Sequence, residues 1–367
     1  MAAIDISPIL KFMLEKNGSD LFFSTGAAIH IKVEGDTLPI NAQIMSLGMV
    51  KEIAYSIMTP AQISEFENTL ECNFAIGQRD LGRFRVNVFK QRGELGMVVR
   101  HIKTEIPTIE SLGLPPILSK LIMRKRGLIL VVGATGSGKT TSLASMIDYR
   151  NANATGHIVT VEDPIEFMYS HKKSVVDQRE VGIDTLSFEN ALKNAMRQAP
   201  DVILIGEIRD MEGMKNALAY AETGHLCLAT LHANNANQAL ERIISFFPEQ
   251  DRSGLLLGLS MNLISIVSQR LISGIQSKRI PAVEVMINTP YISELIQKQK
   301  MSEIKTMMAD SNDIGMMTFD QSLFKLFTNG LIDEENALTN ADSRNDLSLK
   351  IRFAAEAGRS MPSSFGE

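Results

Sequence analysis

The stretch GATGSGKTT (residues 133–141) decides the fold of this chain. It follows the apolar run GLILVV (127–132), which indicates a strand, and precedes SLASMIDYR (142–150), which indicates a helix. Gly133, Gly138, Lys139 and Thr140 fill the frame G-x-x-x-x-G-K-[ST]. A glycine-rich turn between a strand and a helix lets backbone N–H groups close around phosphate oxygens. The sequence therefore predicts a phosphate-binding loop, the Walker A motif.

The residue types of this loop predict ATP and Mg²⁺ as its ligands. Lys139 is expected to neutralise the β- and γ-phosphates, and the Thr140 hydroxyl to ligate Mg²⁺. The residues expected to contact the nucleotide are Gly133, Ala134, Thr135, Gly136, Ser137, Gly138, Lys139, Thr140 and Thr141.

Composition limits the remaining possibilities. The chain has 367 residues, of which 44% are hydrophobic, which is enough for two or three domains with large cores. Its net charge of −5 does not indicate a nucleic-acid or membrane-surface protein. The N-terminus lacks a secretory signal. The apolar stretch GLLLGLSMNLISIV (254–267) is too short to span a bilayer and predicts a buried helix, so we expect no direct membrane insertion.

The chain contains two cysteines, Cys72 and Cys227, and no export signal. Both are expected to be reduced and buried.

The hydrophobic pattern changes along the chain and predicts several regions. An apolar stripe at helical spacing is followed by alternating strands such as AIHIKV and RFRVNVF, which predicts a small α+β domain. A proline-rich linker comes next. The expected limits are 1–102 for the N-terminal domain, 103–118 for the linker, 119–289 for an ATPase domain, 290–345 for a helical region and 346–367 for a disordered tail.

The middle region predicts a parallel sheet. Short apolar runs alternate there with helical segments, as expected for buried parallel strands covered on both faces. The candidate strands are LILVVG, HIVTVED, DVILIGE, HLCLATLH and PAVEVMI.

Acidic side chains follow two of these candidate strands. Glu207 ends the strand in DVILIGEIRD, and Glu162, Asp163 and Glu166 surround Pro164 in VEDPIEF. Ligands of open α/β sheets collect at the carboxyl ends of the strands, so both clusters are expected to face the Walker A loop. The residues alone leave open whether Glu207 contacts Mg²⁺, activates water or does both. They also allow these carboxylates to cap helices or to be solvated.

Two histidines, His225 and His232, bracket the next candidate strand. His232 follows the strand at the same edge of the sheet and is a candidate sensor of the γ-phosphate. A purely structural role is an equal alternative.

The motifs GATGSGKT, VTVEDPIEF, RQAPDVILIGEIRD and TGHLCLATLHANNA, in this order and spacing, resemble the secretion ATPase superfamily that powers type IV pili and type II secretion. In that superfamily they are the Walker A motif, Asp box, Walker B motif and His box. The resemblance covers about residues 1–345. It implies that Glu166 activates water and that Glu207 is the Walker B acid.

The resemblance also implies an architecture. A PAS-like N-terminal domain joins a RecA-like ATPase domain, and six chains form a ring. Arginines of the N-terminal domain reach nucleotide phosphates at the subunit boundary in such rings. The candidates are Arg83, Arg85, Arg92 and Arg100, for each of which surface solvation is the alternative.

The pilus retraction branch is the best match within the superfamily. Assembly and secretion motors usually carry a tetracysteine zinc site after the His box and an extra N-terminal domain, and both are expected to be absent here. Retraction motors resemble AIRNLIRE where this chain has TPYISELIQKQK (289–300). Ser293 and Gln297 stand where the two arginines would be, on a side of the helix expected to be exposed.

This departure indicates an accessory member of the retraction branch. It implies a homo-hexamer that works with a sister retraction ATPase and with an inner-membrane platform protein, at the cytoplasmic base of the pilus machine. Two alternatives come from other classes. A RecA-like nucleic-acid translocase would show a basic and aromatic strand-binding surface, which the sequence does not indicate. A nucleotide-binding regulator would lack turnover, against which Glu166, Glu207 and His232 argue.

Overall fold

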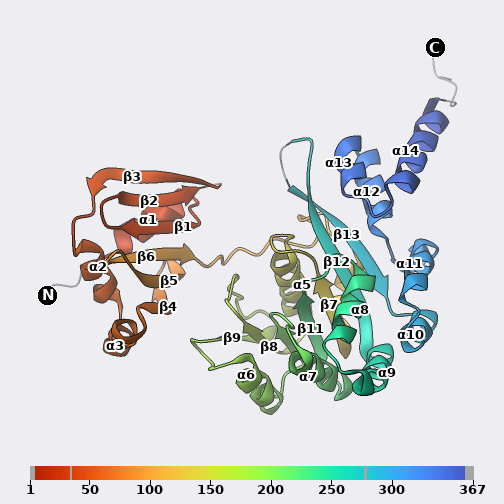
Figure 1. Ribbon diagram of the computed structural model, residues 1–367, viewed down its shortest axis with the longest axis horizontal. Helices are drawn as coiled ribbons and strands as arrows, with labels where there is room; N and C mark the ends of the chain where they lie inside the picture. The colour runs from red at the N-terminus through yellow and green to blue at the C-terminus, as the bar shows by residue number, and fades with distance from the viewer. Residues whose placement is uncertain (1–4, 34, 277–278, 360–367) are drawn as a thin grey trace. The chain divides into compact units, whose positions relative to one another are not determined.

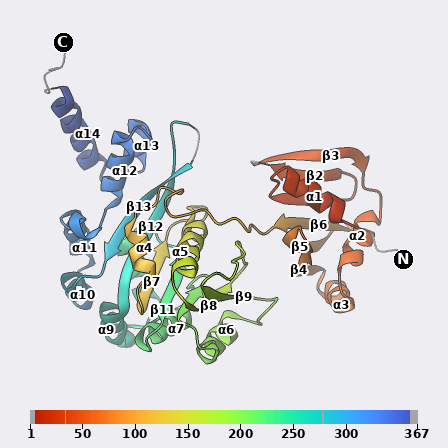
Figure 2. The ribbon, with the colours of Figure 1, turned by 180° about the vertical axis from the view of Figure 1, so that it is seen from behind.

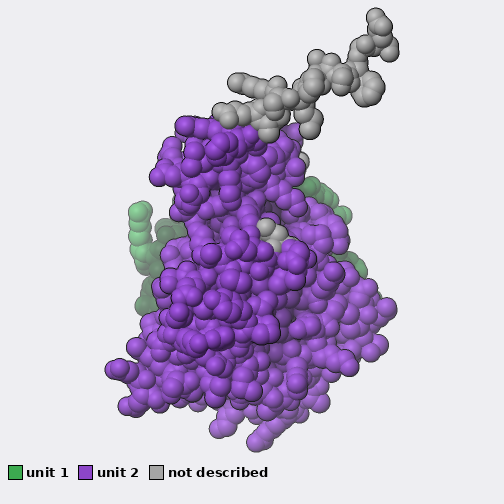
Figure 3. Space-filling view, turned by 90° about the vertical axis from the view of Figure 1, so that its right-hand side faces the viewer, with its two compact units in different colours: residues 1–105, 165–168, 182–186 green, residues 106–164, 169–181, 187–367 purple. Residues whose placement is uncertain are grey.

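The computed structural model describes residues 5–33, 35–276 and 279–359. The chain forms two compact units (Figures 1 and 3). Unit 1 comprises Met1–Glu105, Ile165–Met168 and Gly182–Leu186, and unit 2 comprises Ile106–Pro164, Tyr169–Val181 and Ser187–Glu367.

Unit 1 is built on a six-stranded antiparallel sheet in the order β3-β2-β1-β6-β5-β4. Its strands are β1 (Asp20–Ser24), β2 (Ala28–Val33), β3 (Asp36–Ile44), β4 (Glu71–Gln78), β5 (Gly82–Gln91) and β6 (Glu94–His101). Its helices are α1 (Ser7–Glu15), α2 (Met49–Ile57) and α3 (Pro60–Thr69).

Alternation along the strands gives this sheet one buried face. In β5, Phe84, Val86 and Val88 are fully buried and belong to the same core as Leu10 of α1 and Val50 of α2. The residues between them are only partly buried. The expected strands AIHIKV and RFRVNVF are confirmed as β2 and as part of β5.

Unit 2 contains a seven-stranded sheet in the order β13-β12-β7-β11-β10-β8-β9. Its strands are β7 (Gly127–Val132), β8 (Gly156–Glu162), β9 (Ser174–Glu180), β10 (Val202–Ile205), β11 (Leu226–Leu231), β12 (Leu263–Ser273) and β13 (Arg279–Ile287). All neighbours pair in parallel except β12 and β13, which pair antiparallel. The five expected strands are confirmed, but the sheet is mixed rather than parallel because β13 returns directly from β12 without a crossover helix.

Helices cover both faces of this sheet. Helices α7, α8 and α9 lie in front of it in Figure 1, whereas α4 and α5 lie nearest the viewer in Figure 2. The helices before residue 290 are α4 (Ile117–Ile122), α5 (Lys139–Asn153), α6 (Phe188–Ala195), α7 (Met211–Glu222), α8 (Ala236–Ser245) and α9 (Arg252–Asn262), with short 3-10 turns at Met196–Gln198 and Glu249–Asp251.

The expectation of one buried helix over residues 254–267 is wrong in its second half. Helix α9 ends at Asn262, and the next residues start β12, which pairs with β7. Asn262 ends the helix with its side chain bonded to the carbonyl of Gly258. Continuous apolar sequence does not distinguish the end of a helix from the start of a buried strand.

The C-terminal region is helical, as expected, with α10 (Pro290–Gln297), α11 (Met301–Ala309), a 3-10 turn (Asn312–Ile314), α12 (Phe319–Thr328), α13 (Glu334–Thr339) and α14 (Arg344–Arg359). The predicted disordered tail over 346–367 is wrong for residues 346–359, which belong to α14. Leu347 and Ile351 are one helical turn apart and are buried with Phe319 and Leu323 of α12. This apolar contact stabilises the helix. Residues 360–367 lie outside the described residues.

Cys72 and Cys227 are free and buried, as predicted. Burial raises the pKa of both thiols, which keeps them protonated and unreactive. Among the described residues, no helix is long and apolar enough to cross a membrane.

Candidate nucleotide-binding and hydrolysis site

The Walker A loop joins the end of β7 to the start of α5. Strand β7 is buried along its whole length in the middle of the sheet. Gly138 precedes the first residue of α5 with φ of 87°, a left-handed conformation that favours glycine. The loop therefore delivers the N-terminus of α5 to the carboxyl edge of the sheet, where backbone N–H groups favour an anion.

The charged and polar groups of the loop turn inward. The Lys139 ammonium donates hydrogen bonds to the carbonyl oxygens of Gly133 (2.7 Å) and Ala134 (2.9 Å), so its charge lies within the curve of the loop. Among the described residues, the Ser137 Oγ is one of few buried side-chain polar atoms without a hydrogen-bond partner. A buried hydroxyl without a partner, next to an enclosed ammonium, fits a loop built to receive phosphate oxygens.

Strand ends bring Glu207 and His232 together. Glu207 follows β10 and His232 follows the neighbouring strand β11. The His232 Nε2 lies 3.2 Å from one carboxylate oxygen of Glu207, and the Arg209 Nε donates to the other oxygen at 2.8 Å. The Glu207 carboxylate is thus oriented from both sides at the carboxyl edge. His225 lies at the opposite end of β11, where its Nδ1 contacts Thr223, so it is not part of this cluster.

The acidic cluster after β8 divides into separate roles. Glu162 is buried and accepts hydrogen bonds from Thr160 and Gln178, which makes it a structural carboxylate between β8 and β9. Asp163 points instead toward Arg209, with 3.6 Å between the charged atoms. Arg209 therefore links the acid of β8 to the acid of β10. The sequence interpretation did not single out Arg209, although it stands two residues after Glu207 in GEIRD.

Glu166 belongs to a different compact unit from Asp163 and Glu207. It belongs to the segment 165–168 of unit 1, whereas Asp163 and Glu207 belong to unit 2. The backbone of this segment pairs with the chain just after β6, since the Met168 N–H donates to the Lys103 carbonyl at 2.9 Å. The Glu166 side chain is exposed. Its role in activating water stays a prediction.

Three of the four candidate arginines share one face of the unit 1 sheet. Arg83 and Arg85 alternate with the buried residues of β5, and Arg85 pairs in register with Arg100 of β6. The Arg100 Nε donates to the Asp20 carboxylate at 2.7 Å, so one of the hydrogen-bond donors of Arg100 is already in use. Arg92 lies in the turn after β5, at the far end of that strand, and is exposed. Arg83, Arg85 and Arg100 therefore lie on one face of the sheet, and Arg92 lies elsewhere.

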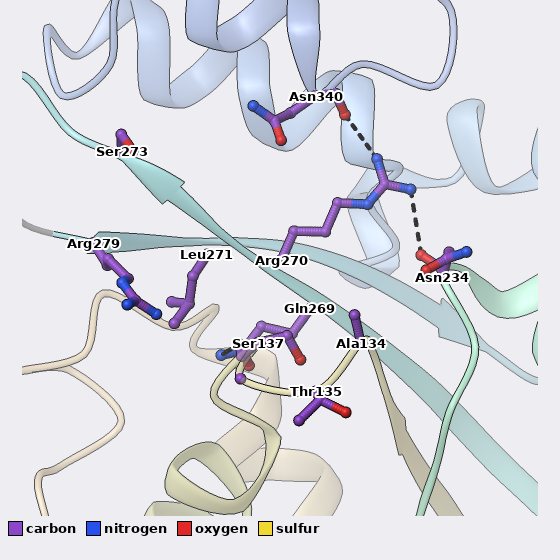
Figure 4. Close-up of a pocket in the computed structure, with 11 residues that line it drawn as sticks. Ala134, Thr135, Ser137, Asn234, Gln269, Arg270, Leu271, Ser273, Arg279 and Asn340 are labelled. Carbon is purple, nitrogen blue, oxygen red and sulfur yellow. Dashed lines mark hydrogen bonds between the residues drawn. The ribbon is translucent and has the colours of Figure 1, made fainter.

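A cavity of about 370 Å³ opens beside the Walker A loop (Figure 4). Ala134–Ser137 form one side of it, and the end of β12 forms another. Arg270 of β12 donates to the carbonyl oxygens of Asn340 (2.7 Å) and Asn234 (3.3 Å), and the close-up shows its guanidinium between them. Its neighbour Gln269 lies against the loop. The sequence interpretation missed both residues, because it predicted no strand here; its expected helix, 254–267, covered only the start of β12.

A buried carboxylate supports the loop after the His box. Glu284 of β13 accepts hydrogen bonds through one oxygen from the Ala236 N–H (2.8 Å) and the Ser268 hydroxyl (3.0 Å). Ala236 is the first residue of α8, so the carboxylate satisfies an N–H group at a helix start. Burial raises the pKa of Glu284 to about 7, although both hydrogen bonds oppose the shift.

Comparison with known proteins gives this architecture a family. The model of the "Type II/IV secretion system protein" family matches residues 2–316. The type IV pilus ATPase PilU of Pseudomonas aeruginosa is 52% identical over 355 residues, which cover 96% of this chain and 93% of that protein. The type IV pilus retraction ATPase PilT of the same organism is 41% identical, with 92% of this chain and 98% of that protein covered.

A solved structure agrees with these relatives. The crystal structure of the pilus retraction motor PilT with bound ADP superposes with a TM-score of 0.88 at 40% identity and covers 94% of this chain and 99% of that one. The chain belongs to the type II/IV secretion system protein family. The predicted fold class, an α/β ATPase core with a smaller N-terminal α+β domain, is confirmed, and so is the resemblance to PilU-like type IV pilus retraction ATPases. Family membership also confirms the prediction of an ATP-hydrolysing enzyme.

The raised pKa of Glu284 predicts a pH-dependent contribution to stability. Between its ordinary pKa of 4.5 and about 7, the folded protein holds a proton on Glu284 that the unfolded chain has lost. The stability of the wild type relative to Glu284→Gln is therefore expected to fall as pH rises through this window, by at most about 1.4 kcal/mol per pH unit, and to level off above it. Thermal unfolding of both proteins from pH 5 to 8 measures the difference.

The matched control is Glu241→Gln on the exposed surface of α8. Its difference from the wild type should show no such trend. A difference between wild type and Glu284→Gln that stays constant across the window would contradict the shifted pKa.

Proposed function

We propose that this protein is a hexameric ATP-driven motor for retraction of type IV pili, which produces twitching motility. The observation that carries the proposal is the meeting of Glu207 and His232 at the edge where Lys139 closes the Walker A loop. An acid and an imidazole at the strand ends, beside a phosphate loop, form an arrangement suited to hydrolysis of a terminal phosphate.

The residues have separate roles in this proposal. Residues 133–141 surround the phosphates, and the Lys139 ammonium neutralises them. Thr140 and Glu207 would hold Mg²⁺, which would supply positive charge to the phosphates when nucleotide is bound. Glu166 activates the attacking water, and His232 senses the γ-phosphate while it orients Glu207. The short contacts of Glu207 to His232 and Arg209 support its part, because a carboxylate fixed from two sides keeps one geometry.

Substitutions separate binding from hydrolysis. Lys139→Ala is expected to lose most ATP affinity, because the ammonium is the cation enclosed by the loop. Glu207→Gln and Glu166→Gln should still bind ATP but hydrolyse it about a hundredfold more slowly or worse, since they act on metal and water. Equilibrium binding of a fluorescent ATP analogue and a steady-state phosphate-release assay measure the two effects.

Glu249→Gln, an exposed neutralisation in the 3-10 turn Glu249–Asp251 that lines neither cavity beside the Walker A loop, is the control and should behave like the wild type. Normal turnover by Lys139→Ala would remove the loop from the mechanism. Normal turnover by either glutamine variant would remove that residue alone.

The arginines of unit 1 support a ring. Arg83, Arg85 and Arg100 stand on a sheet face that has no covering helix of its own unit among the described residues, whereas α1 and α2 pack on the other face. Cations on an open face can serve a phosphate site on a neighbouring chain, where neutralising transition-state charge accelerates hydrolysis by a large factor. We therefore propose a homo-hexamer in which a neighbour completes each site.

ATP hydrolysis per chain is expected to fall on dilution, as the ring dissociates and the sites lose these cations. Mass photometry and the ATPase assay, run over the same concentration series, should show the loss of hexamer and of activity together. Arg85→Ala should lower activity without changing the mass, while Arg79→Ala, in the exposed turn before β5, should do neither. A monomer with full activity would refute the shared site.

The helix α10 supports an accessory role. Ser293 and Gln297 were expected on its exposed side; Gln297 is exposed and Ser293 is partly buried, and both side chains also bind helix α9. The Ser293 hydroxyl donates to the Ser260 carbonyl at 2.8 Å, and the Gln297 amide donates to the Ser260 hydroxyl at 2.9 Å. Their neutral side chains hold α10 on α9 and present no cation to a partner. Identity is also higher to the PilU relative than to the PilT relative.

We propose that this motor acts with a PilT-like sister ATPase on an inner-membrane platform protein, from the cytoplasmic side of the pilus base. Cells that keep this motor and lack the sister are expected to be unable to retract pili, because α10 lacks the cations for a charge-assisted contact. Adding a sister that binds but cannot hydrolyse ATP should restore twitching only when Lys139 is intact. Normal twitching without the sister would reject the accessory role.

A further inference from the structure

Strand β12 presents successive side chains to opposite faces of the sheet. Ser268 and Arg270 point toward the α8 face, where they contact Glu284 and the Asn234 carbonyl. Gln269, between them, points toward the other face, where α5 and the Walker A loop lie. Ser268 is paired with Val132, the last residue of β7. Gln269 is therefore level with the point where β7 becomes the loop.

The Gln269 side chain is buried and bonded to two places in this region. Its Nε2 donates to the Ser137 carbonyl at 2.9 Å, and its Oε1 accepts from the Ser142 hydroxyl at 2.7 Å. A backbone carbonyl can only accept, so the amide nitrogen must face Ser137 and the oxygen must face Ser142. One amide thus joins the loop to the first turns of α5.

The bond to Ser137 fixes the direction of a peptide group. The peptide between Ser137 and Gly138 is trans, and in a trans peptide the N–H points opposite to the C=O. Because the Ser137 carbonyl points at Gln269, the Gly138 N–H points away from β12. Gly138 immediately precedes Lys139, the first residue of α5, so its N–H belongs to the group of helix-start donors that a phosphate meets.

We propose that Gln269 is a positioning residue for nucleotide binding, which holds the Walker A loop in its phosphate-binding conformation. This inference rests on the proposed role of the loop. It also gives a steric reason for two glycines of the motif. A Cβ on Gly138 would lie 2.7 Å from the Gln269 Nε2, and a Cβ on Gly133 would lie 2.5 Å from the Gln269 carbonyl oxygen. Gln269 lies against both ends of the loop in space that only glycine leaves open.

Substitution of Gln269 tests the proposal in the full-length protein. Gln269→Met keeps the size of the side chain and removes both hydrogen bonds, and the dissociation constant of a fluorescent ATP analogue is expected to rise roughly three- to tenfold. Gln269→Glu keeps the acceptor, loses the donor and places a negative charge beside the loop, so its loss of affinity should be larger. In both variants the KM for ATP should change more than kcat, because the residue positions a binding group and does not touch the reacting atoms.

Ser142→Ala removes the second anchor and leaves the bond to Ser137. It should weaken binding less than Gln269→Met, and adding it to Gln269→Met should cause no further loss, because both changes break the same connection. The matched control is Ser265→Ala, on the same strand, which loses a buried hydroxyl bond to the Met286 carbonyl away from the loop. Its affinity for the analogue should stay within about twofold of the wild type. This change is smaller than the loss expected when a hydrogen bond at the loop is removed.

The outcomes separate this inference from the proposed function. Wild-type affinity in Gln269→Met, together with lost affinity in Lys139→Ala, would overturn the role of Gln269 and leave the nucleotide site standing. Wild-type affinity in Lys139→Ala would overturn the site itself. An equal loss in Ser265→Ala and Gln269→Met would show a general effect on β12 and also refute positioning. Should Gln269→Met fail to fold, the comparison of Ser142→Ala with Ser265→Ala decides, because only the first touches the connection.

Discussion

The parallel pairing of β7 with β12 is the constraint on which the nucleotide site depends. Val132 and Ser268 are in register, so the Walker A loop leaves its strand beside Gln269. Strand β7 is buried throughout and β12 over most of its length, and a slip of one residue would turn every side chain of β12 to the opposite face. Gln269 would then lose Ser137 and Ser142, while Arg270 would lose the Asn234 carbonyl. The register thus fixes the loop and its surroundings together.

The proposed catalytic edge depends on the order of strands in space. Strands β11, β10 and β8 are neighbours, although α7 separates β10 from β11 in sequence and a longer stretch separates β8 from β10. His232, Glu207 and Asp163 follow these three strands; His232 contacts Glu207, and Arg209 links Glu207 to Asp163. A carboxylate bonded on both sides has little freedom to rotate, which suits a group that must meet a metal or water in one geometry. The same strand order leaves Glu162 buried as a structural acid.

Strand β12 also connects the site to the C-terminal helices. The Arg270 guanidinium lies 3.9 Å from the centre of the Phe319 ring and pairs with Asp342 at 2.7 Å. Burial alone would raise the pKa of Asp342, but Arg270 and Lys305 together lower it, so the carboxylate stays ionised. Because Arg270 also holds the Asn234 carbonyl, the helices after residue 318 and the loop after the His box share one side chain. A cation satisfied at several points resists displacement of either partner.

The sequence by itself determined the Walker A loop between a strand and a helix, the strands with acids or histidine at their ends, and the alternation that buries one face of β5, because these features are set by local residue types and periodicity. It did not determine that residues 263–273 form a strand, since their apolar run continues that of α9. Nor did it indicate that α14 is ordered, because its polar composition is offset by the contact of Leu347 and Ile351 with α12. No sequence pattern indicated a role for Gln269 or Arg209, because each is a single polar residue. Their roles were decided by tertiary structure, because a hydrogen bond to Ser137 or a link between two acids exists only once separate strands are paired.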